Sequence, residues 1–297
     1  MTIKRVGLIG VGLMGHGIGK NILAKGYHLT VMAHQKRGPV DDLIARGAVE
    51  RNNPLSVAKE SDLVIICVTG SPQVEHIVHG EYGLIHAVRP GLIIADCSTA
   101  EPDSTKRIAA DIEAKGGHFV DTPMTRTPKE AEAGKLGLMT GGPEAVIAKI
   151  RPVLECFADT IVHAGGVGSA HQLKLINNFL SICHAAVAAE AITVAAKAGV
   201  DMQALKDIVM AGGAASVMFG RLINVPLHDD DSSAQFAIRN ARKDLRYYTN
   251  MTEQLPATSF LAETAHQITV MADNMGYGDR FIPRLIDVLM TVNGMKK

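Results

Sequence analysis

The stretch Val6-Gly-Leu-Ile-Gly10-Val-Gly-Leu-Met-Gly15 near the N-terminus decides the fold of this chain. Its first four residues have the pattern of a short buried strand, and residues 14–25 have that of a helix, which Gly26 ends. A strand, the spacing G-x-G-x-x-G and a helix form a dinucleotide-binding fingerprint, because glycines let the backbone approach a pyrophosphate and amides at the helix start hold it. The predicted cofactor-binding residues of this stretch are Gly10, Gly12, Leu13, Met14 and Gly15.

Length and composition set limits on the rest of the chain. At 297 residues the chain exceeds the usual size of one domain, and 47% hydrophobic residues can fill a large core. The 30 basic and 30 acidic residues balance, so we expect neither nucleic acid nor a membrane surface as a partner. Beyond the N-terminal stretch we expect no segment apolar enough to span a bilayer. The 4 cysteines stand singly in apolar sequence, which favours core thiols in a cytoplasmic protein and no metal site.

Strand-like apolar runs alternate with helical patterns up to about residue 164. The runs cover residues 28–33, 63–68, 92–95, 118–120 and 160–163, and the helical patterns cover 40–46, 73–79, 104–115 and 144–157. This alternation predicts an α/β domain over residues 1–164, with a doubly wound, mainly parallel sheet of the Rossmann type. Ligands bind beyond the carboxyl ends of such strands, so Val68, Thr69 and Thr99 are candidates for the nicotinamide side of the cofactor.

The end of the second predicted strand bears on the choice between NAD and NADP. An NAD-selective site usually places Asp or Glu there to accept the ribose 2′-hydroxyl. This chain has Ala33-His-Gln-Lys-Arg37 with no acid before Asp41, and a cationic cluster suits a 2′-phosphate. We therefore predict that NADP is favoured over NAD, with His34, Lys36 and Arg37 at the cofactor. A plain solvated loop is the alternative interpretation of the same residues.

The stretch Asp121-Thr-Pro-Met-Thr-Arg-Thr-Pro128 follows another predicted strand. An arginine between two threonines, flanked by prolines, offers a fork for an anion and two hydroxyl groups on a stiff loop. Thr125, Arg126 and Thr127 are therefore predicted to bind a small anionic substrate. An exposed arginine in a turn is the alternative interpretation of this pattern.

The pattern changes after Gly165, where strand-like runs stop and helical patterns cover most of the chain. They extend over residues 169–198, 201–210, 216–222, 234–251, 257–274 and 281–293, so we predict an all-α domain over residues 165–297, joined by a long helix. On that helix Lys174, Asn177, Asn178 and Ser181 have the spacing i, i+3, i+4 and i+7 of one face. Such a polar face indicates a site, or else a lysine that reaches water and asparagines that bond locally.

Four motifs in this order resemble those of the β-hydroxyacid dehydrogenase family, which includes 3-hydroxyisobutyrate dehydrogenase. They are the glycine turn of residues 7–15, Asp96-Cys-Ser-Thr99, Gly166-x-Gly168-x₅-Lys174-x₂-Asn177-Asn178, and Lys243-Asp244-Leu245. The resemblance covers nearly the whole chain. It implies an NAD(P)-dependent oxidoreductase that interconverts a short 3-hydroxy acid and its semialdehyde, a homodimer or homotetramer, and a Lys243 that reaches the cofactor.

One loop departs from the family pattern, in which Asp-x-Pro-Val-Ser-Gly-Gly is common. Here Arg126 replaces a glycine, and the loop is closest to that of sulfolactaldehyde reductases, in which the arginine is expected to hold the sulfonate. Those enzymes have an Asp at the end of the second strand, which this chain lacks. Activity on a sulfonate is therefore an alternative to the 3-hydroxy acid.

Hydride transfer to or from a hydroxy acid needs a group that manages the proton of the hydroxyl. We predict that Lys174 is the general base in oxidation and the acid in reduction, that Asn178 orients the substrate oxygen, and that Asn177 and Ser181 support the acid group. The lysine speaks against an imine reductase, which generally lacks it. No cysteine has the polar, glycine-flanked setting that a sugar-nucleotide dehydrogenase needs. A sensor that binds NADP without chemistry is the remaining alternative.

Overall fold

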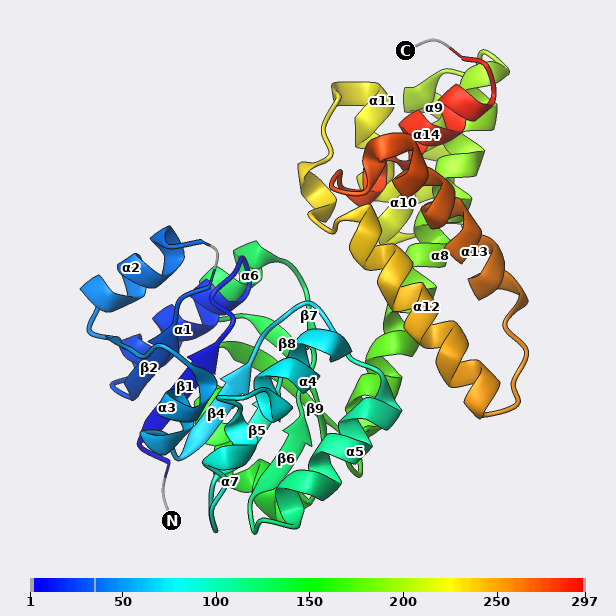
Figure 1. Ribbon diagram of the computed structural model, residues 1–297. Helices are drawn as coiled ribbons and strands as arrows, with labels where there is room; N and C mark the ends of the chain where they lie inside the picture. The colour runs from blue at the N-terminus through cyan, green and yellow to red at the C-terminus, as the bar shows by residue number, and fades with distance from the viewer. Residues whose placement is uncertain (1–2, 35, 296–297) are drawn as a thin grey trace. The chain divides into compact units, whose positions relative to one another are not determined.

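The computed structural model describes residues 3–34 and 36–295. The chain divides into two compact units, Met1–Lys174 and Leu175–Lys297 (Figure 1). The division falls inside one long helix, α8 (Ser169–Lys197), and so lies later in the chain than residue 164, where the strand-like runs stop. A separate domain from residue 165 stays a prediction.

The first unit is built on one sheet, which the described residues form from nine strands in the order β3-β2-β1-β4-β5-β6-β8-β7, with β9 beside β8. The first six strands of that order pair in parallel, whereas β8 runs antiparallel to β6 and β7. The predicted doubly wound, mainly parallel sheet is therefore confirmed. The strands are β1 (Arg5–Ile9), β2 (His28–Met32), β3 (Val49–Glu50), β4 (Leu63–Ile66), β5 (Ile93–Asp96), β6 (His118–Asp121), β7 (Met124–Thr125), β8 (Leu136–Gly141) and β9 (Ala158–Gly165).

Both faces of this sheet are covered, because alternate side chains of one strand enter different cores. In β4, Leu63 and Ile65 pack into one core with α1, α2 and α7, whereas Val64 and Ile66 pack into a second core with α3, α4 and α5. Burial on both faces explains why the strands are continuous apolar runs rather than alternating ones. The helices are α1 (Gly15–Ala24), α2 (Gly38–Ala45), α3 (Pro54–Lys59), α4 (Ser71–His79), α5 (Pro102–Glu113), α6 (Pro128–Glu132) and α7 (Glu144–Leu154).

Several short elements of the first unit were not predicted. Strand β8 has the sequence Leu-Gly-Leu-Met-Thr-Gly, whose glycines weaken the strand pattern. It forms because β6, β7 and β9 all pair with it. Helix α6 has five residues and is held by a capping box between Thr127 and Glu130. Such elements depend on tertiary partners or on caps, which periodicity does not detect.

The second unit is all-helical, as predicted, and its core gathers side chains from α8 together with those of the helices that follow. Helix α12 begins at Ile238 rather than at the predicted residue 234, because Ala237 forms a β-bridge with Phe281. The remaining helices are α9 (Met202–Met210), α10 (Val217–Leu222), α11 (Asn224–His228), α12 (Ile238–Gln254), α13 (Phe260–Ala272) and α14 (Leu285–Val292).

Helix α8 corrects the expectation that no later segment is apolar enough to span a bilayer. By length and composition it qualifies as a membrane-crossing helix, a test that the core helix of a soluble protein also passes. Its side chains Ile182, Ala185, Ala189 and Ile192 are buried in the helical core of the second unit. That packing accounts for one face of α8, whereas Val187 and Val194 on the same helix are exposed.

Candidate active site

The glycine turn before α1 has the geometry that the fingerprint predicts. Gly10 has a φ of +102°, and a Cβ there would lie 2.1 Å from the carbonyl oxygen of Cys67. A Cβ on Gly15 would lie 2.0 Å from the carbonyl oxygen of Gly10. At Gly12, by contrast, no atom of a described residue lies within 4 Å of the Cβ position. Gly10 and Gly15 therefore allow the tight turn, and Gly12 leaves open space at the start of α1. Beside it, Met14 is half-buried and Leu13 is 69% exposed.

The loops after β4 and β5 are tied together at the carboxyl edge of the sheet. The backbone amide of Val68 donates to Oγ of Ser98 at 3.0 Å, and the amide of Glu101 donates to Oγ of Ser71 at 2.8 Å. These bonds hold the segment of Val68 and Thr69 beside that of Thr99, as the predicted nicotinamide side requires.

The loop after β2 is exposed at His34, Lys36 and Arg37, and Gln35 in the same loop lies outside the described residues. Arg37 does not project as a free cation, because its guanidinium lies 2.6 Å from Glu50 on β3 and 2.8 Å from Asp41 on α2. A 2′-phosphate at this position would compete with both carboxylates for Arg37.

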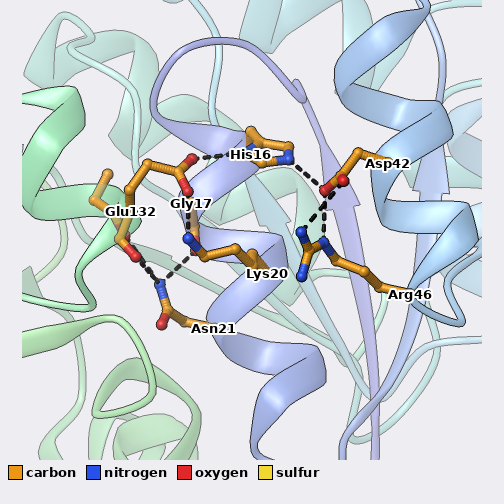
Figure 2. A network of polar contacts seen from close by, with 8 residues as sticks. His16, Gly17, Lys20, Asn21, Asp42, Arg46 and Glu132 are labelled. Carbon is orange, nitrogen blue, oxygen red and sulfur yellow. Dashed lines mark hydrogen bonds and ion pairs between the residues drawn. The ribbon is translucent and has the colours of Figure 1, made fainter.

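One histidine, which no sequence motif indicates, links helices α1, α2 and α6 (Figure 2). His16 on α1 lies 2.6 Å from Glu132 on α6 through Nδ1, and 2.8 Å from Asp42 on α2 through Nε2. Lys20 also binds Glu132, and Arg46 also binds Asp42. Burial lowers the pKa of His16, but the hydrogen bonds to the two carboxylates outweigh burial and raise this pKa above 6.5. The hydrogen bond from Arg46, with that from His16, lowers the pKa of Asp42 to about 2.

The predicted anion loop follows β6 and leads into α6. Arg126 adopts the left-handed region with a φ of +79°, and its Nη1 lies 2.7 Å from Oδ1 of Asp159 on β9 and also donates to the carbonyl of Lys135. The hydroxyl of Thr127 donates to the carboxylate of Glu130 in the capping box of α6, and Thr125 is half-buried on β7. Arg126 and Thr127 thus have protein partners, which a substrate anion would have to share or displace.

The polar residues predicted on the long helix all lie on α8, which is continuous from Ser169 to Lys197. Lys174 and Asn177 are half-buried, as is Ser181, whereas Asn178 is buried. Their spacing places them along one face of the helix.

In the second unit, Asn178 and Lys243 share one buried carboxylate. Asn178 Nδ2 donates to Oδ2 of Asp244 at 2.6 Å, and Lys243 Nζ lies 2.6 Å from Oδ1 of the same residue. Asn177 Nδ2 donates to Oδ1 of Asn178 at 3.2 Å, and the ammonium of Lys243 lies 4.7 Å from the ring centroid of Tyr247. Asp244 was given no role from the sequence, although it stands inside the motif Lys243-Asp244-Leu245.

The cysteines lack the properties of thiolate nucleophiles. Burial raises the pKa of the Cys67 thiol to about 12 and that of the Cys183 thiol to about 11. Burial also raises the pKa values of Cys97 and Cys156. These groups are protonated near neutral pH, which agrees with the sequence argument against a sugar-nucleotide dehydrogenase.

Comparison with known proteins covers both units. The family model for the NAD-binding domain of 6-phosphogluconate dehydrogenase matches residues 5–166. A second model, for the NAD-binding of NADP-dependent 3-hydroxyisobutyrate dehydrogenase, matches residues 168–289. Together they cover the glycine turn, α8 and the motif that contains Lys243.

Individual relatives match over almost the full length. The chain is 30% identical to 2-(hydroxymethyl)glutarate dehydrogenase of Eubacterium barkeri over 98% of this chain and 96% of that protein. It is 27% identical to 3-sulfolactaldehyde reductase of Escherichia coli over 98% of this chain and 97% of the relative. The crystal structure of 3-hydroxyisobutyrate dehydrogenase from Salmonella typhimurium is 27% identical, with a TM-score of 0.85, and the match covers 96% of this chain and 99% of that one. The chain therefore belongs to the β-hydroxyacid dehydrogenase family of NAD(P)-dependent oxidoreductases.

Proposed function

We propose that this enzyme interconverts a short 3-hydroxy acid, or a related anionic hydroxy compound, and its aldehyde, with Lys174 as the general acid and base. The observation that carries the proposal is the polar face of α8. Lys174 and Asn178 lie one turn apart on this helix, and Asp244 fixes the amide of Asn178 through a 2.6 Å hydrogen bond. An amine and an oriented amide on one face provide a proton carrier beside a group that can hold the substrate oxygen.

The residues present fit a dinucleotide. Gly10, Gly12 and Gly15 form a turn that is closed by backbone and open at its centre, at the start of α1. When bound, NAD(P)⁺ supplies the hydride acceptor for oxidation of the alcohol. In that direction the amine of Lys174 takes the proton of the substrate hydroxyl, and in reduction it returns the proton to the oxygen. The amide of Asn178 holds that oxygen in place.

For the substrate we propose a carboxylate, with a sulfonate as the alternative, held by Thr125, Arg126 and Thr127. A guanidinium fork binds either anion, and Arg126 is exposed and available for exchange of partners with Asp159. The resemblance to 2-(hydroxymethyl)glutarate dehydrogenase supports a carboxylate, and that to 3-sulfolactaldehyde reductase supports a sulfonate.

For the cofactor we propose NADP in preference to NAD. The segment between β2 and α2 contains no acidic side chain, and Lys36 in it is exposed. The second matching family model describes an NADP-dependent enzyme. Arg37 is paired with Asp41 and Glu50, which reduces what it can contribute to binding a 2′-phosphate. The preference for NADP is therefore proposed mainly from Lys36 and from the lack of an Asp or Glu between β2 and α2.

We propose a homodimer or homotetramer as the assembly. Val187 and Val194 on α8 are 68% and 60% exposed and lie two turns apart on one face of the helix, where a second copy could cover them. Light scattering of the purified protein measures the mass directly, and a monomer over a range of concentrations contradicts the proposal.

The test of the function is a panel of hydroxy acids and hydroxysulfonates, each oxidised with NAD⁺ and NADP⁺ in parallel. We expect turnover of at least one hydroxy acid, and a loss of about 10²- to 10⁴-fold in kcat on Lys174→Ala with cofactor affinity retained. Normal turnover by Lys174→Ala would remove the lysine from the mechanism. Tight cofactor binding without turnover of any substrate would instead support a non-catalytic sensor.

A further inference from the structure

A buried aspartate anchors the start of α8. Asp121 is the last residue of β6 and is fully buried. Its Oδ1 accepts a hydrogen bond from the amide of Gly168 at 2.8 Å, and its Oδ2 accepts one from the amide of His171 at 2.9 Å. These amides open the helix and lack partners within it, and a carboxylate at this end also complements the helix dipole.

The side chain of His171 forms a second anchor on the first turn of α8. The ring is fully buried, with Nδ1 2.7 Å from Oγ1 of Thr105 on α5 and Nε2 3.2 Å from the carbonyl oxygen of Ser98 after β5. The carbonyl of Ser98 can only accept, so Nε2 carries a hydrogen and donates to it. The ring therefore joins α8 both to α5 and to the segment that follows β5.

Two buried carboxylates flank this ring. Asp121 Oδ2 lies 4.0 Å from Nδ1 of His171, and Asp96 Oδ2 lies 3.9 Å from Nε2. Asp96 and Asp121 are register partners at the ends of β5 and β6, so their side chains leave the sheet on the same side. Among the described residues Asp96 Oδ2 has no hydrogen-bond partner. The ring of His171 therefore lies between the ends of β5 and β6, against both buried carboxylates.

Lys174 follows His171 by three residues on the same helix, and it lies within the same compact unit as the sheet. We propose that Asp121 and His171 are positioning residues for Lys174. They fix the rotation and the axial position of the first turns of α8 against β5, β6 and α5, and so set where the amine of Lys174 is presented. This inference rests on the proposed role of Lys174 as the general acid and base.

The competing explanation is a clamp that only stabilises the fold, and the chain offers a matched control for it. Asp62 also accepts two backbone amides through one carboxylate, from Lys4 at 3.1 Å and from Arg5 at 3.0 Å. It lies where β1 and β4 begin, at the opposite edge of the sheet from the ends of β5 and β6. Asp62 also forms an ion pair with the side chain of Arg5 at 2.6 Å. Asp62→Asn therefore weakens a carboxylate that holds backbone amides, together with this ion pair, without touching α8.

The experiment compares Asp121→Asn, His171→Ala, His171→Gln and Asp62→Asn in the full chain, by Tm and by kcat and KM for the hydroxy acid and the cofactor. We expect Asp121→Asn and Asp62→Asn both to lower Tm, but only Asp121→Asn to lower kcat, by about 10- to 100-fold with the cofactor KM nearly unchanged. His171→Gln keeps one donor near the position of Nε2 and should retain more activity than His171→Ala. In a Lys174→Ala background Asp121→Asn should cause no further loss, because both changes act through the same amine.

Equal kcat values for Asp121→Asn and Asp62→Asn would overturn the inference. So would a further loss in the Lys174→Ala background as large as that in the wild type. If Asp121→Asn does not fold, the two His171 variants carry the same comparison. Failure of the proposed function has a different signature, which is a wild-type enzyme whose turnover does not depend on Lys174.

Discussion

Asn178 on α8 and Asp244 on α12 are joined by a 2.6 Å hydrogen bond, and both side chains are buried, with 8% and 2% of their surface exposed. The same carboxylate binds Lys243, so one buried acid orients an amide and an ammonium that the sequence assigned separately. A buried carboxylate persists only when such partners offset its loss of hydration. The polar groups of the second unit therefore form one network rather than independent contacts.

Asp244→Ala should destabilise the protein and lower activity together. It leaves the buried amide of Asn178 without its acceptor and removes the ion-pair partner of Lys243, for which we expect a loss of about 3 kcal/mol in the free energy of unfolding. Urea unfolding followed by circular dichroism measures this loss.

The matched control for that variant is Asp273→Ala, which removes the ion pair of Arg242 on the same helix α12. That pair is half-exposed, so its removal should cost at most about 1 kcal/mol. If Asp244→Ala and Asp273→Ala lower the free energy of unfolding equally, burial does not make the contacts of Asp244 stronger than those of an exposed ion pair.

The stability of the first unit should fall as the pH rises above about 6.5, through the network of His16. The two carboxylates raise the pKa of His16 in the folded state above its ordinary value of 6.5. The folded protein therefore binds the proton more tightly than the unfolded chain, and this contribution is complete below pH 6.5 and lost as the pH passes the folded pKa. The pKa of Asp42 is lowered in the folded state, so its contribution to stability is present above pH 3.8 and is lost as the pH falls toward about 2.

Chemical unfolding from about pH 5 to about pH 9 checks the alkaline part of this profile. His16→Gln should flatten it, whereas His79→Gln should leave it unchanged, because the ring of His79 is exposed and lies 3.5 Å from a single carboxylate, that of Asp111. A wild-type profile with the same slope as that of His16→Gln would show that the network does not respond to pH.

Local patterns in the sequence predicted much of this fold, and the failures share one physical cause. The glycine turn, the alternating strands and α8 are encoded by neighbours in the chain, because steric limits and periodicity act over a few residues. The partners of His16 lie 26 and 116 residues away, and Asp244 lies 66 residues from Asn178. Such pairs exist only after folding has brought the elements together, and a single sequence carries no local signal of them.

For the anion loop, too, the sequence does not reveal a partner that is distant in the chain. The sequence presents Arg126 as a fork between two hydroxyls, and nothing near it in the chain reveals that Asp159 binds the guanidinium. The residue type predicted what the side chain can bind, and the fold determined which partner it has in the absence of substrate.

Asp159→Asn should therefore improve the binding of an anionic substrate. Without its carboxylate partner, Arg126 is released to the substrate, and we expect KM for the hydroxy acid to fall by about 2- to 5-fold with kcat little changed. Arg126→Ala should raise the same KM by about 10-fold or more, and Arg126→Lys should recover part of this loss. Steady-state kinetics with an anionic substrate and with its uncharged ester separate these effects. An unchanged KM in Arg126→Ala would remove the arginine from the substrate site.

Gly12→Ala and Gly10→Ala should separate cofactor binding from folding within one turn. At Gly12 the added methyl group meets no atom of the described residues, so the variant should fold with a Tm close to that of the wild type. The same open space is where a pyrophosphate approaches the backbone, so we expect its affinity for NADP to fall by about 10-fold or more.

Gly10→Ala has the opposite problem, because its methyl group would lie 2.1 Å from the carbonyl oxygen of Cys67 and its φ of +102° disfavours any side chain. We expect this variant to lose stability first and cofactor binding only as a consequence. Thermal unfolding with and without NADP measures both properties in one series, since a bound ligand raises Tm. If Gly12→Ala binds NADP as tightly as the wild type, the cofactor does not approach the backbone at this turn, even though the turn has the geometry of a dinucleotide site.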